Sequence, residues 1–410
     1  MEKNTQRDDA AKGKIMRILY YTWEENSRDD MVSTLRGLGH QVEVCAAPCR
    51  DYEDDAELAA ILEEAIHLRH VECLFSFNFF PVLAKTAERC KLKYISWIYD
   101  CPHWTLFSPA VKGAYNYIFV FDRRQYQQLK AVGVQHCYHF PMAVNTTRLE
   151  AQLGENGTGQ ESLPRGNIQG GDSLEVSFVG SLYENNLYDK VHYLPEYIRG
   201  YLSGIMEVQE RIYGYNFVSE LLSDEVVSQM QQFISMDLPQ GYFVTKRELF
   251  ASMLNGKITC RERIGLLREL SERFNLTMYT ASDIAVLPRA RAGGIVDYVS
   301  QMPKVFRNSK INLNISLRSI QSGIPLRALD IMGAGGFLLS NYQPELAEYF
   351  EDGKELVLYT SPQDLLDKTA YYLTHEDERK AIGRAGFAKV KRLFSYEVRV
   401  EEMLRLADVL

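Results

Sequence analysis

The feature of this sequence that most constrains its fold is a regular alternation of short apolar segments with amphipathic ones. In the first part of the chain the pattern predicts strands at 16–21, 41–45, 71–77, 93–99 and 115–121, with helices between them. Strands separated by helices need crossover connections, which are right-handed and favour a parallel, doubly wound sheet. The alternation therefore predicts an α/β fold.

The same alternation starts again after residue 173. Further strands are predicted at 173–181, 275–280, 310–316, 337–340 and 355–360. A mostly helical stretch from about 188 to 274 interrupts this second region. Two Thr-x-x-Glu boxes, Thr245–Glu248 and Thr259–Glu262, predict helix starts within that stretch. We expect two Rossmann-like doubly wound domains, the second with a helical insertion.

A chain of 410 residues is too long for one ordinary core. The expected organisation is a disordered lead-in at 1–14, a first domain at 15–150, a glycine-rich linker at 151–173, a second domain at 174–392 and a terminal segment at 393–410. Two such domains in tandem would place the carboxyl ends of two parallel sheets around a cleft, which is where open α/β sheets bind ligands.

Composition excludes several classes of function. The net charge of −8 argues against a nucleic-acid partner, which would select a basic surface. No apolar run approaches the ~18 residues that a membrane span needs, and the N-terminus lacks the apolar core of a signal peptide. Seven scattered cysteines fit a reducing compartment, so we expect a cytoplasmic protein. No Asp-x-Asp or zinc-type spacing occurs, so no metal is expected.

One stretch, GIPLRALDIMGAGGFLLS from residue 323, invites a specific interpretation. Pro325 suits the first position of a helix, where its missing N–H costs nothing. Arg327 and Asp330 are three residues apart and would share one side of that helix. A glycine-bounded helix start with fixed polar groups suits a phosphorylated ligand. The alternative is an ordinary βα-unit that carries a surface ion pair.

Other residues at predicted strand ends are candidate ligand contacts. Gly180 and Ser181 follow the strand at 173–181, where glycine lets the backbone approach a phosphate, although a plain tight turn would look the same. Asn312 and Asn314 alternate along a strand, so both would point to one sheet face. The remaining candidates are Gly294 and Ile295, in a loop that would close over a base or lie free in solvent.

The first domain offers a second candidate site. Asp100 and His103 follow the strand at 93–99, and Trp97 and Trp104 flank them. Indole rings commonly stack on sugar rings, and a carboxylate or an imidazole within hydrogen-bond reach can deprotonate a hydroxyl group. A structural histidine is the alternative for His103. Asp122, which precedes a predicted helix, is interpreted as a helix N-cap.

Several motifs resemble those of one known family. FSFNFFP, YISWIYDCPHW, IFVFDRRQYQQLKAVG, HFPMAVN, FVGSLYENN, KINLNIS, GIPLRALDIMGAGGFLLS and the closing SYEVR occur in this order between about 16 and 405. Together they resemble the CgeB-like (spore-maturation protein B-like) glycosyltransferases. The resemblance implies a GT-B fold, with an N-terminal acceptor domain, a C-terminal nucleotide-sugar domain and a last helix that crosses back to the first domain.

The resemblance also implies roles for the residues. Asp330 would accept hydrogen bonds from ribose hydroxyl groups, and Arg327 would offset diphosphate charge. The expected co-substrates are a nucleotide sugar, foremost a UDP-sugar, and a hydroxyl-bearing acceptor, with no cofactor and no metal. Trp97 and Trp104 would bind the acceptor, and Asp100 or His103 would be the catalytic base.

Two departures from the family pattern stand out. Ser322 occupies a position where related GT-B enzymes often carry a glutamate, and Phe394-Ser395-Tyr396 replaces His-Thr-Tyr. Two alternatives to transfer remain open: a nucleotide-sugar epimerase, and a non-catalytic module that binds a sugar nucleotide or a glycan. The sequence leaves the oligomeric state open.

Overall fold

The computed structural model of this chain describes residues 14–154, 174–191 and 193–409. Nearly all of the predicted lead-in and most of the predicted linker lie outside these residues. Contacts divide the chain into two units. Unit 1 contains the described residues up to Val120, Leu129–Tyr138 and the chain from Tyr396, and unit 2 contains Phe121–Gln128 and His139–Ser395. The sequence pattern placed the end of the first domain at residue 150. The contacts place the change from unit 1 to unit 2 earlier, between Tyr138 and His139.

Unit 1 is built on a six-stranded parallel sheet in the order β2-β1-β3-β4-β5-β6. Its strands are β1 (Arg17–Tyr21), β2 (Gln41–Cys45), β3 (Cys73–Phe77), β4 (Lys93–Trp97), β5 (Asn116–Val120) and β6 (Cys137–His139). Every residue of β3 is buried. This burial explains the unbroken apolar run CLFSF, because a central parallel strand is covered on both faces.

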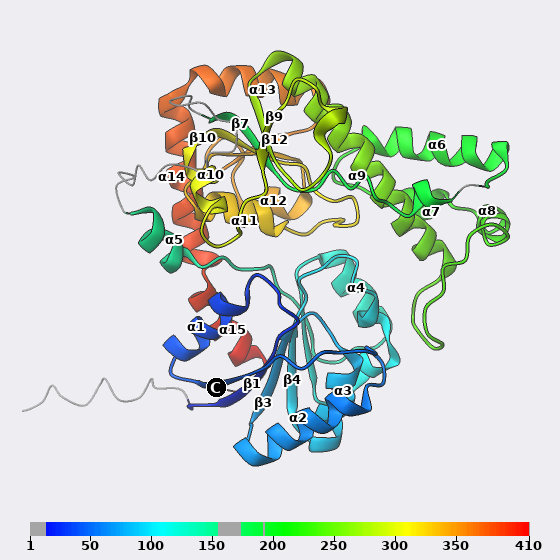
Figure 1. Cartoon of the computed structure of the whole chain (residues 1–410), viewed down its shortest axis with the longest axis vertical. Coiled ribbons are helices and arrows are strands. Elements are labelled where there is room, and N and C mark those ends of the chain that lie inside the picture. The colour runs from blue at the N-terminus through cyan, green and yellow to red at the C-terminus, as the bar shows by residue number, and fades with distance from the viewer. Residues whose placement is uncertain (1–13, 155–173, 192, 410) are drawn as a thin grey trace, which may run out of the picture. The chain divides into compact units, whose positions relative to one another are not determined.

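Helices cover both faces of this sheet (Figure 1). Helices α1 (Arg28–Gly37) and α15 (Tyr396–Leu406) lie together on one side of the strands, and α2 (Ala56–Arg69) and α3 (Pro81–Cys90) lie on the other. Right-handed crossovers require this split, because the step from β1 to β2 runs opposite to the later steps. Lys93 Nζ donates to the carbonyl oxygens of Ala407 and Asp408 at 3.0 and 2.6 Å. The C-terminal helix is thus part of unit 1.

Of three further short elements, the 3₁₀ helices η1 (Trp104–Phe107) and η2 (Pro109–Lys112) belong to unit 1, and α4 (Arg123–Ala131) begins in unit 2 and ends in unit 1. Asp122 caps α4, because its Oδ1 accepts the main-chain N–H of Arg124 at 2.8 Å. The predicted role of Asp122 as an N-cap is confirmed.

Unit 2 holds a second six-stranded parallel sheet, in the order β12-β11-β10-β7-β8-β9. Its strands are β7 (Leu174–Val179), β8 (Leu276–Tyr279), β9 (Arg291–Gly294), β10 (Ser309–Asn314), β11 (Leu338–Asn341) and β12 (Val357–Tyr359). Its helices outside the insertion are α5 (Thr146–Leu153), α10 (Met302–Asn308), α11 (Leu326–Gly333), α12 (Pro344–Tyr349), α13 (Pro362–Thr374) and α14 (Glu376–Leu393). The two sheets confirm the predicted α/β fold.

The main core of unit 2 lies between its sheet and two helices. Leu267 and Leu270 of α9 (Lys246–Arg273) and Leu366 of α13 pack with Leu313 and Leu339 from the sheet. Crossovers that run in the opposite direction along the sheet place α10 and α11 on the other face. Both faces of the sheet are therefore covered, and its C-terminal edge remains as the natural place for a ligand.

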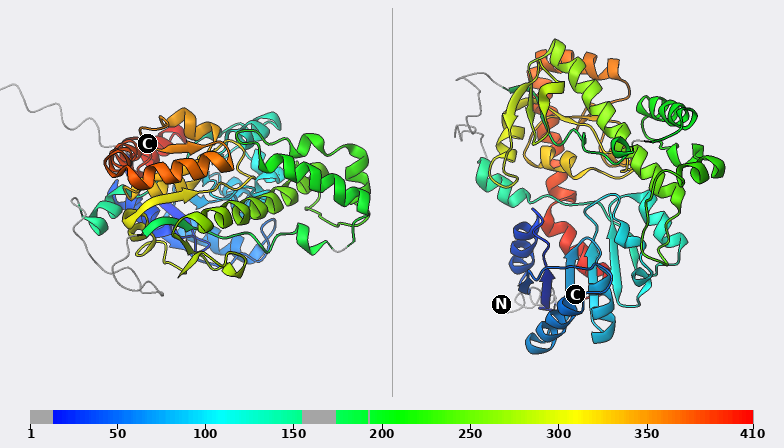
Figure 2. Two further views of the ribbon diagram at one scale, coloured as in Figure 1. Left: turned by 90° about the horizontal axis from the view of Figure 1, so that it is seen from above. Right: turned by 45° about the vertical axis from the view of Figure 1, so that its right-hand side comes forward.

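The predicted helical insertion is present between β7 and β8. It contains the 3₁₀ helix η3 (Tyr188–Lys190), α6 (Glu196–Glu210), α7 (Val218–Leu221), α8 (Asp224–Met230) and α9. These helices share a core of their own, around Leu202, Val218, Met230, Phe250 and Leu254. Figures 1 and 2 show α6 standing apart from the sheet, with α9 running between the two.

One of the two predicted helix starts in the insertion is correct. Thr245 begins α9 with a complete capping box to Glu248. The second prediction is wrong, because α9 continues without interruption through Thr259. There the Thr259 hydroxyl donates to the carbonyl oxygen of Asn255, one turn earlier, at 2.8 Å. Pro325 is the N-cap of α11 and not its first helical residue.

Candidate active site

The loop after β7 lies at the C-terminal edge of the unit 2 sheet. Gly180 donates its N–H to the carbonyl oxygen of Tyr279 at 3.1 Å, and the Ser181 carbonyl accepts from Arg263 Nη1 at 2.5 Å. A Cβ on Gly180 would lie 3.3 Å from the Phe178 ring and 3.5 Å from Arg263 Nη1. The tight neighbour is the Phe178 ring, whereas the distance to Arg263 is an ordinary contact, so the glycine mainly leaves room for that ring.

Arg263, on α9, is the residue that our interpretation of the sequence missed. Its guanidinium is buried, donates only to the carbonyl oxygens of Ser181 and Ile315, and lies 5.2 and 5.0 Å from the ring centroids of Phe178 and Tyr183. Within the described chain no carboxylate forms an ion pair with it. Burial is the main reason that the pKa of Arg263 is lowered to about 10.

A signal for Arg263 does exist in the sequence. Arg263 stands four and seven residues before Leu267 and Leu270, so it lies on the apolar face of α9. A charged residue on such a face needs a structural or functional reason to be buried.

Arg327 and Asp330 occupy one side of α11, as predicted. Arg327 Nη1 donates to Asp330 Oδ2 at 3.1 Å, and the hydroxyl of Tyr298 donates to Asp330 Oδ1 at 3.0 Å. The Asp330 side chain is buried, whereas 29% of the Arg327 side chain is exposed. The ion pair is the arrangement that the alternative interpretation expected. The proposed contacts of both residues with a ligand stay predictions.

The predictions for Asn312 and Asn314 need correction. Asn312 is fully buried, its Nδ2 donates to the carbonyl oxygens of Phe306 and Phe337, and its Oδ1 accepts from Ser177. The Nδ2 of Asn314, also buried, donates to the Ser316 and Ser340 hydroxyl groups at 3.1 and 2.9 Å. These amides tie β10 to its neighbours and are out of reach of a ligand. They do share one sheet face, but α10 and the loops around it cover that face.

Gly294 and Ile295 lie at the end of β9. Gly294 has a left-handed backbone conformation, with φ of +77°, and its carbonyl oxygen accepts from the N–H of Thr280 at 2.9 Å. Ile295 is 75% exposed. An apolar side chain held in solvent by a glycine turn is compatible with either alternative that the sequence left open. The contact with a base stays a prediction.

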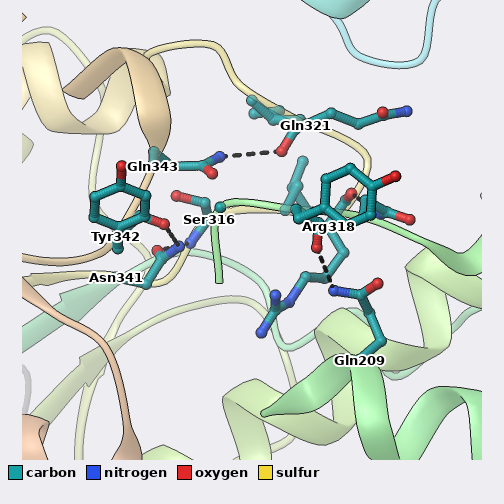
Figure 3. Close-up of a pocket in the computed structure, with 12 residues that line it drawn as sticks. Gln209, Ser316, Arg318, Gln321, Asn341, Tyr342 and Gln343 are labelled. Atoms are coloured by element: carbon teal, nitrogen blue, oxygen red, sulfur yellow. Dashed lines mark hydrogen bonds between the residues drawn. The ribbon is translucent and has the colours of Figure 1, made fainter. Parts of the chain in front are cut away.

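A polar pocket lies at the C-terminal ends of β10 and β11 (Figure 3). It is lined by Gln209, Gly214, Tyr215, Asn216, Ser316, Leu317, Arg318, Ile320, Gln321, Asn341, Tyr342 and Gln343. The Arg318 guanidinium is occupied by Glu262, at 2.7 Å, and by the carbonyl oxygen of Ile212. What the pocket offers a ligand is therefore mainly amide and hydroxyl groups, which suits a neutral polar ligand.

Ser322, the departure from the family pattern, is held by two carboxylates of unit 2. Its hydroxyl donates to Glu345 Oε1 at 2.8 Å and lies 3.3 Å from Asp122 Oδ1. Asp122 Oδ2 also accepts the main-chain N–H groups of Gln321, Ser322 and Gly323, at 2.7, 3.1 and 3.3 Å. Two carboxylates from other parts of the chain therefore lie within hydrogen-bond distance of the residue 322 hydroxyl.

The two tryptophans predicted in unit 1 are not equivalent. Trp97 is fully buried and stacks on Phe77 with 5.7 Å between ring centroids, so the prediction that it contacts an acceptor is wrong. It belongs to β4 and faces the core, which the sequence pattern did not resolve. Trp104 is half-buried and lies 6.3 Å from the Phe107 ring. Trp104 as an acceptor contact stays a prediction.

The two candidate bases, Asp100 and His103, also differ in their exposure and in their hydrogen bonds. His103 Nε2 accepts the N–H of Phe79 at 3.0 Å, and burial lowers the pKa of His103. That nitrogen already forms a hydrogen bond with the main chain, as expected for a structural histidine. Asp100 is exposed, and its Oδ2 accepts from the Asn78 side chain at 2.7 Å. The geometry favours Asp100 over His103 as the base.

No group of three or more His, Cys, Asp or Glu side chains within the described residues is arranged to hold a metal ion. Among the helices of the described chain, none combines the length and apolar character that a membrane span requires.

Known proteins resemble this chain in sequence over one region and in fold over almost all of it. A family model described as glycosyl transferase-like matches residues 261–405. No curated protein matches the sequence. A glycosyltransferase from Rickettsia africae ESF-5 has a TM-score of 0.53 and 11% identity, over 96% of this chain and 98% of that one.

Two further solved structures are similar to this one. HepE from Anabaena, in complex with UDP and glucose, has a TM-score of 0.51 and 8% identity, over 96% of this chain and 100% of that one. A sucrose-phosphate synthase from Thermosynechococcus elongatus has a TM-score of 0.50 and 12% identity, over 96% of this chain and 98% of that one. At these identities the likeness shows the fold, which is the two-sheet GT-B architecture.

Proposed function

We propose that this protein is a glycosyltransferase that moves a sugar from a nucleoside diphosphate, foremost a UDP-sugar, to a hydroxyl group of an acceptor. The observation that carries the proposal is the presence of two guanidinium groups, those of Arg263 and Arg327, on elements at the C-terminal edge of the unit 2 sheet. Arg263 lies against the loop after β7, and Arg327 lies near the start of α11, which follows β10. Both cations could offset the charge of a diphosphate, and the guanidinium fork matches phosphate oxygens.

The comparisons support the same function. The matched glycosyl transferase-like region, 261–405, contains Arg263, Arg327 and Asp330. HepE, whose structure contains UDP and glucose, has the same fold. A donor that placed its ribose at Asp330 would use the carboxylate oxygens that Tyr298 and Arg327 now orient.

The proposed reaction makes one bond and breaks another. An acceptor hydroxyl oxygen attacks the anomeric carbon of the donor sugar, and the bond from that carbon to the diphosphate breaks. The nucleoside diphosphate leaves, and its charge is stabilised by fixed cations that need no rearrangement. The hydroxyl proton passes to a base, for which Asp100 of unit 1 is the candidate.

The proposal is tested by incubating the protein with UDP-, GDP-, CDP- and dTDP-sugars and measuring released nucleoside diphosphate. We expect release, slow with water and faster with an acceptor. Arg263→Lys keeps the charge but loses the fork and part of its buried hydrogen bonds to Ser181 and Ile315, so it should weaken UDP binding and also lower the unfolding temperature. Arg268→Gln, at an exposed position five residues further along α9, is the matched control. Binding without release, or formation of an epimerised sugar nucleotide, would refute transfer.

A further inference from the structure

Two aromatic side chains mark the C-terminal edge of the unit 1 sheet. Trp23 follows β1 and is 36% exposed, and its indole N–H donates to the carbonyl oxygen of Phe77 at 3.1 Å. Tyr99 follows β4, and its ring centroid lies 6.5 Å from that of Trp23 at an interplanar angle of 77°. The indole is therefore held by its nitrogen, and it contacts Tyr99, the residue that precedes Asp100.

Asp100 is held in place by one amide side chain. Asn78 Nδ2 donates to Asp100 Oδ2 at 2.7 Å, and Asn78 Oδ1 accepts the N–H groups of Tyr99 and Asp100 at 2.9 and 3.1 Å. Asn78 is buried and has a φ of 60°, a conformation that asparagine tolerates better than most residues. Its carbonyl oxygen also accepts from Ser76 at 2.7 Å. One residue thus fixes the loop and the carboxylate together.

We propose that this edge of unit 1 binds a carbohydrate acceptor, with the apolar face of a sugar ring on Trp23 and a hydroxyl group at Asp100 oriented by Asn78. An aromatic surface next to a carboxylate matches a sugar, which presents C–H groups on one face and hydroxyl donors at its rim. No cation pairs with Asp100 in the described part of the chain, which disfavours a phosphorylated or acidic acceptor. The catalytic part of this inference rests on the proposed function, and the binding part does not.

Sugar binding is tested through tryptophan fluorescence. The chain has three tryptophans, and Trp97 is buried. We would titrate the protein with the methyl glycosides of glucose, galactose, mannose and N-acetylglucosamine. At least one should change the fluorescence. Trp23→Phe should abolish that change, and Trp23→Ala should weaken binding about 10-fold, whereas Tyr197→Phe, at an exposed position on α6, should keep both. No response to any of the four glycosides, or a response that persists in Trp23→Phe, would overturn the proposal.

The role of Asn78 is tested with a double-mutant cycle, in which kcat is measured for variants of Asn78 and Asp100 singly and together. Asn78→Gly removes the amide without straining a backbone at positive φ. Asp100→Asn should lower kcat for transfer by roughly 10²–10⁴-fold. Asn78→Gly should lower it at least 10-fold, and the double variant should be no slower than Asp100→Asn alone, since the two residues act as one unit. Ser76→Ala, which removes a bond of the same loop but leaves Asp100 untouched, should keep its kcat. Multiplicative losses in the double variant would show that Asn78 acts only on structure.

Failure of this inference can be told apart from failure of the proposed function. UDP binding by unit 2 is measured separately and should be equal in all of these variants. Sugar-dependent quenching at Trp23 without nucleoside diphosphate release would retain the binding site and reject transfer. Transfer that persists unchanged in Trp23→Ala and Asn78→Gly would retain the function and reject this acceptor site.

Discussion

The sharpest prediction concerns Arg327→Gln, which removes a cation but keeps a polar side chain of similar length. The residue is partly exposed and forms an i,i+3 ion pair with Asp330 at 3.1 Å. Asp330 is buried, so loss of its cationic partner should cost about 1–3 kcal/mol of stability. Tyr298 continues to donate to Asp330, so that carboxylate is not left without a hydrogen bond. The variant should therefore be less stable than the parent, and its unfolding is measured without ligand as the reference.

Diphosphate binding should weaken as a separate effect. A charge-assisted hydrogen bond contributes about 1.5–3 kcal/mol, which corresponds to a Kd for UDP that rises about 10- to 150-fold. Uridine has no phosphate, so its Kd should not change. At a UDP concentration 100 times the parent Kd, ligand stabilises the parent by about 2.7 kcal/mol. A variant with 100-fold weaker binding gains only about 0.4 kcal/mol under the same conditions.

Titration calorimetry with UDP and uridine measures the affinities, and urea unfolding with and without UDP measures the stabilisation. Arg268→Gln, which removes an exposed arginine of α9, should behave as the parent in both assays. An equal rise of Kd for UDP and uridine would show that Arg327 does not contact phosphate. An unchanged Kd for both would remove Arg327 from the donor site.

Three further predictions follow from other features. Glu262→Gln should lower the free energy of unfolding in urea by about 3 kcal/mol, because it breaks a buried ion pair with Arg318 at 2.7 Å. Glu376→Gln, in an exposed pair with Lys380, should change it by less than about 0.5 kcal/mol. Burial lowers the pKa of His40 and of His103, so the unfolded chain binds more protons than the folded one below about pH 6.5. Stability should therefore be full above that pH and fall as the pH drops through the window down to the lowered pKa values. His40→Gln should flatten this slope in unfolding series between pH 5 and pH 8. Sugar transfer should persist in excess chelator, because arginine side chains are proposed to offset the diphosphate charge; activity restored only by manganese or magnesium would contradict this.

Local patterns predicted those parts of the structure that depend on neighbours in the sequence. The capping box at Thr245, the N-cap at Asp122 and the shared helix side of Arg327 and Asp330 each involve residues two or three positions apart. The two parallel sheets were also predictable from the sequence, because strands alternate with helices along the chain. The period-2 and period-3.6 patterns of apolar residues indicate which segments are strands and which are helices. Where a box lay inside a longer helix, at Thr259, the local pattern was misleading.

The candidate site depends on contacts between distant segments, and there the sequence was less informative. Arg263 reaches the Ser181 carbonyl across 82 positions, from a helix that begins in the insertion. The alternation of Asn312 and Asn314 was correct, but only the packing of α10 on the sheet decides that their shared face is covered. The burial of Trp97 is likewise set by the partners of β4, namely Phe77 and Tyr396. A side-chain type can be read from one segment, whereas its exposure is a property of all the segments around it.

The carboxylate of Asp122 has a consequence for what the start of α11 can recognise. Three consecutive N–H groups, of Gln321, Ser322 and Gly323, already share one oxygen of that side chain. The chain has supplied its own counter-ion to a cluster of donors that would otherwise attract a phosphate group. An incoming anion would have to displace Asp122 and leave it buried without those bonds, which is unfavourable. We therefore expect this end of the sheet to bind uncharged groups of a ligand, and we expect its anionic groups to bind at Arg263 and Arg327.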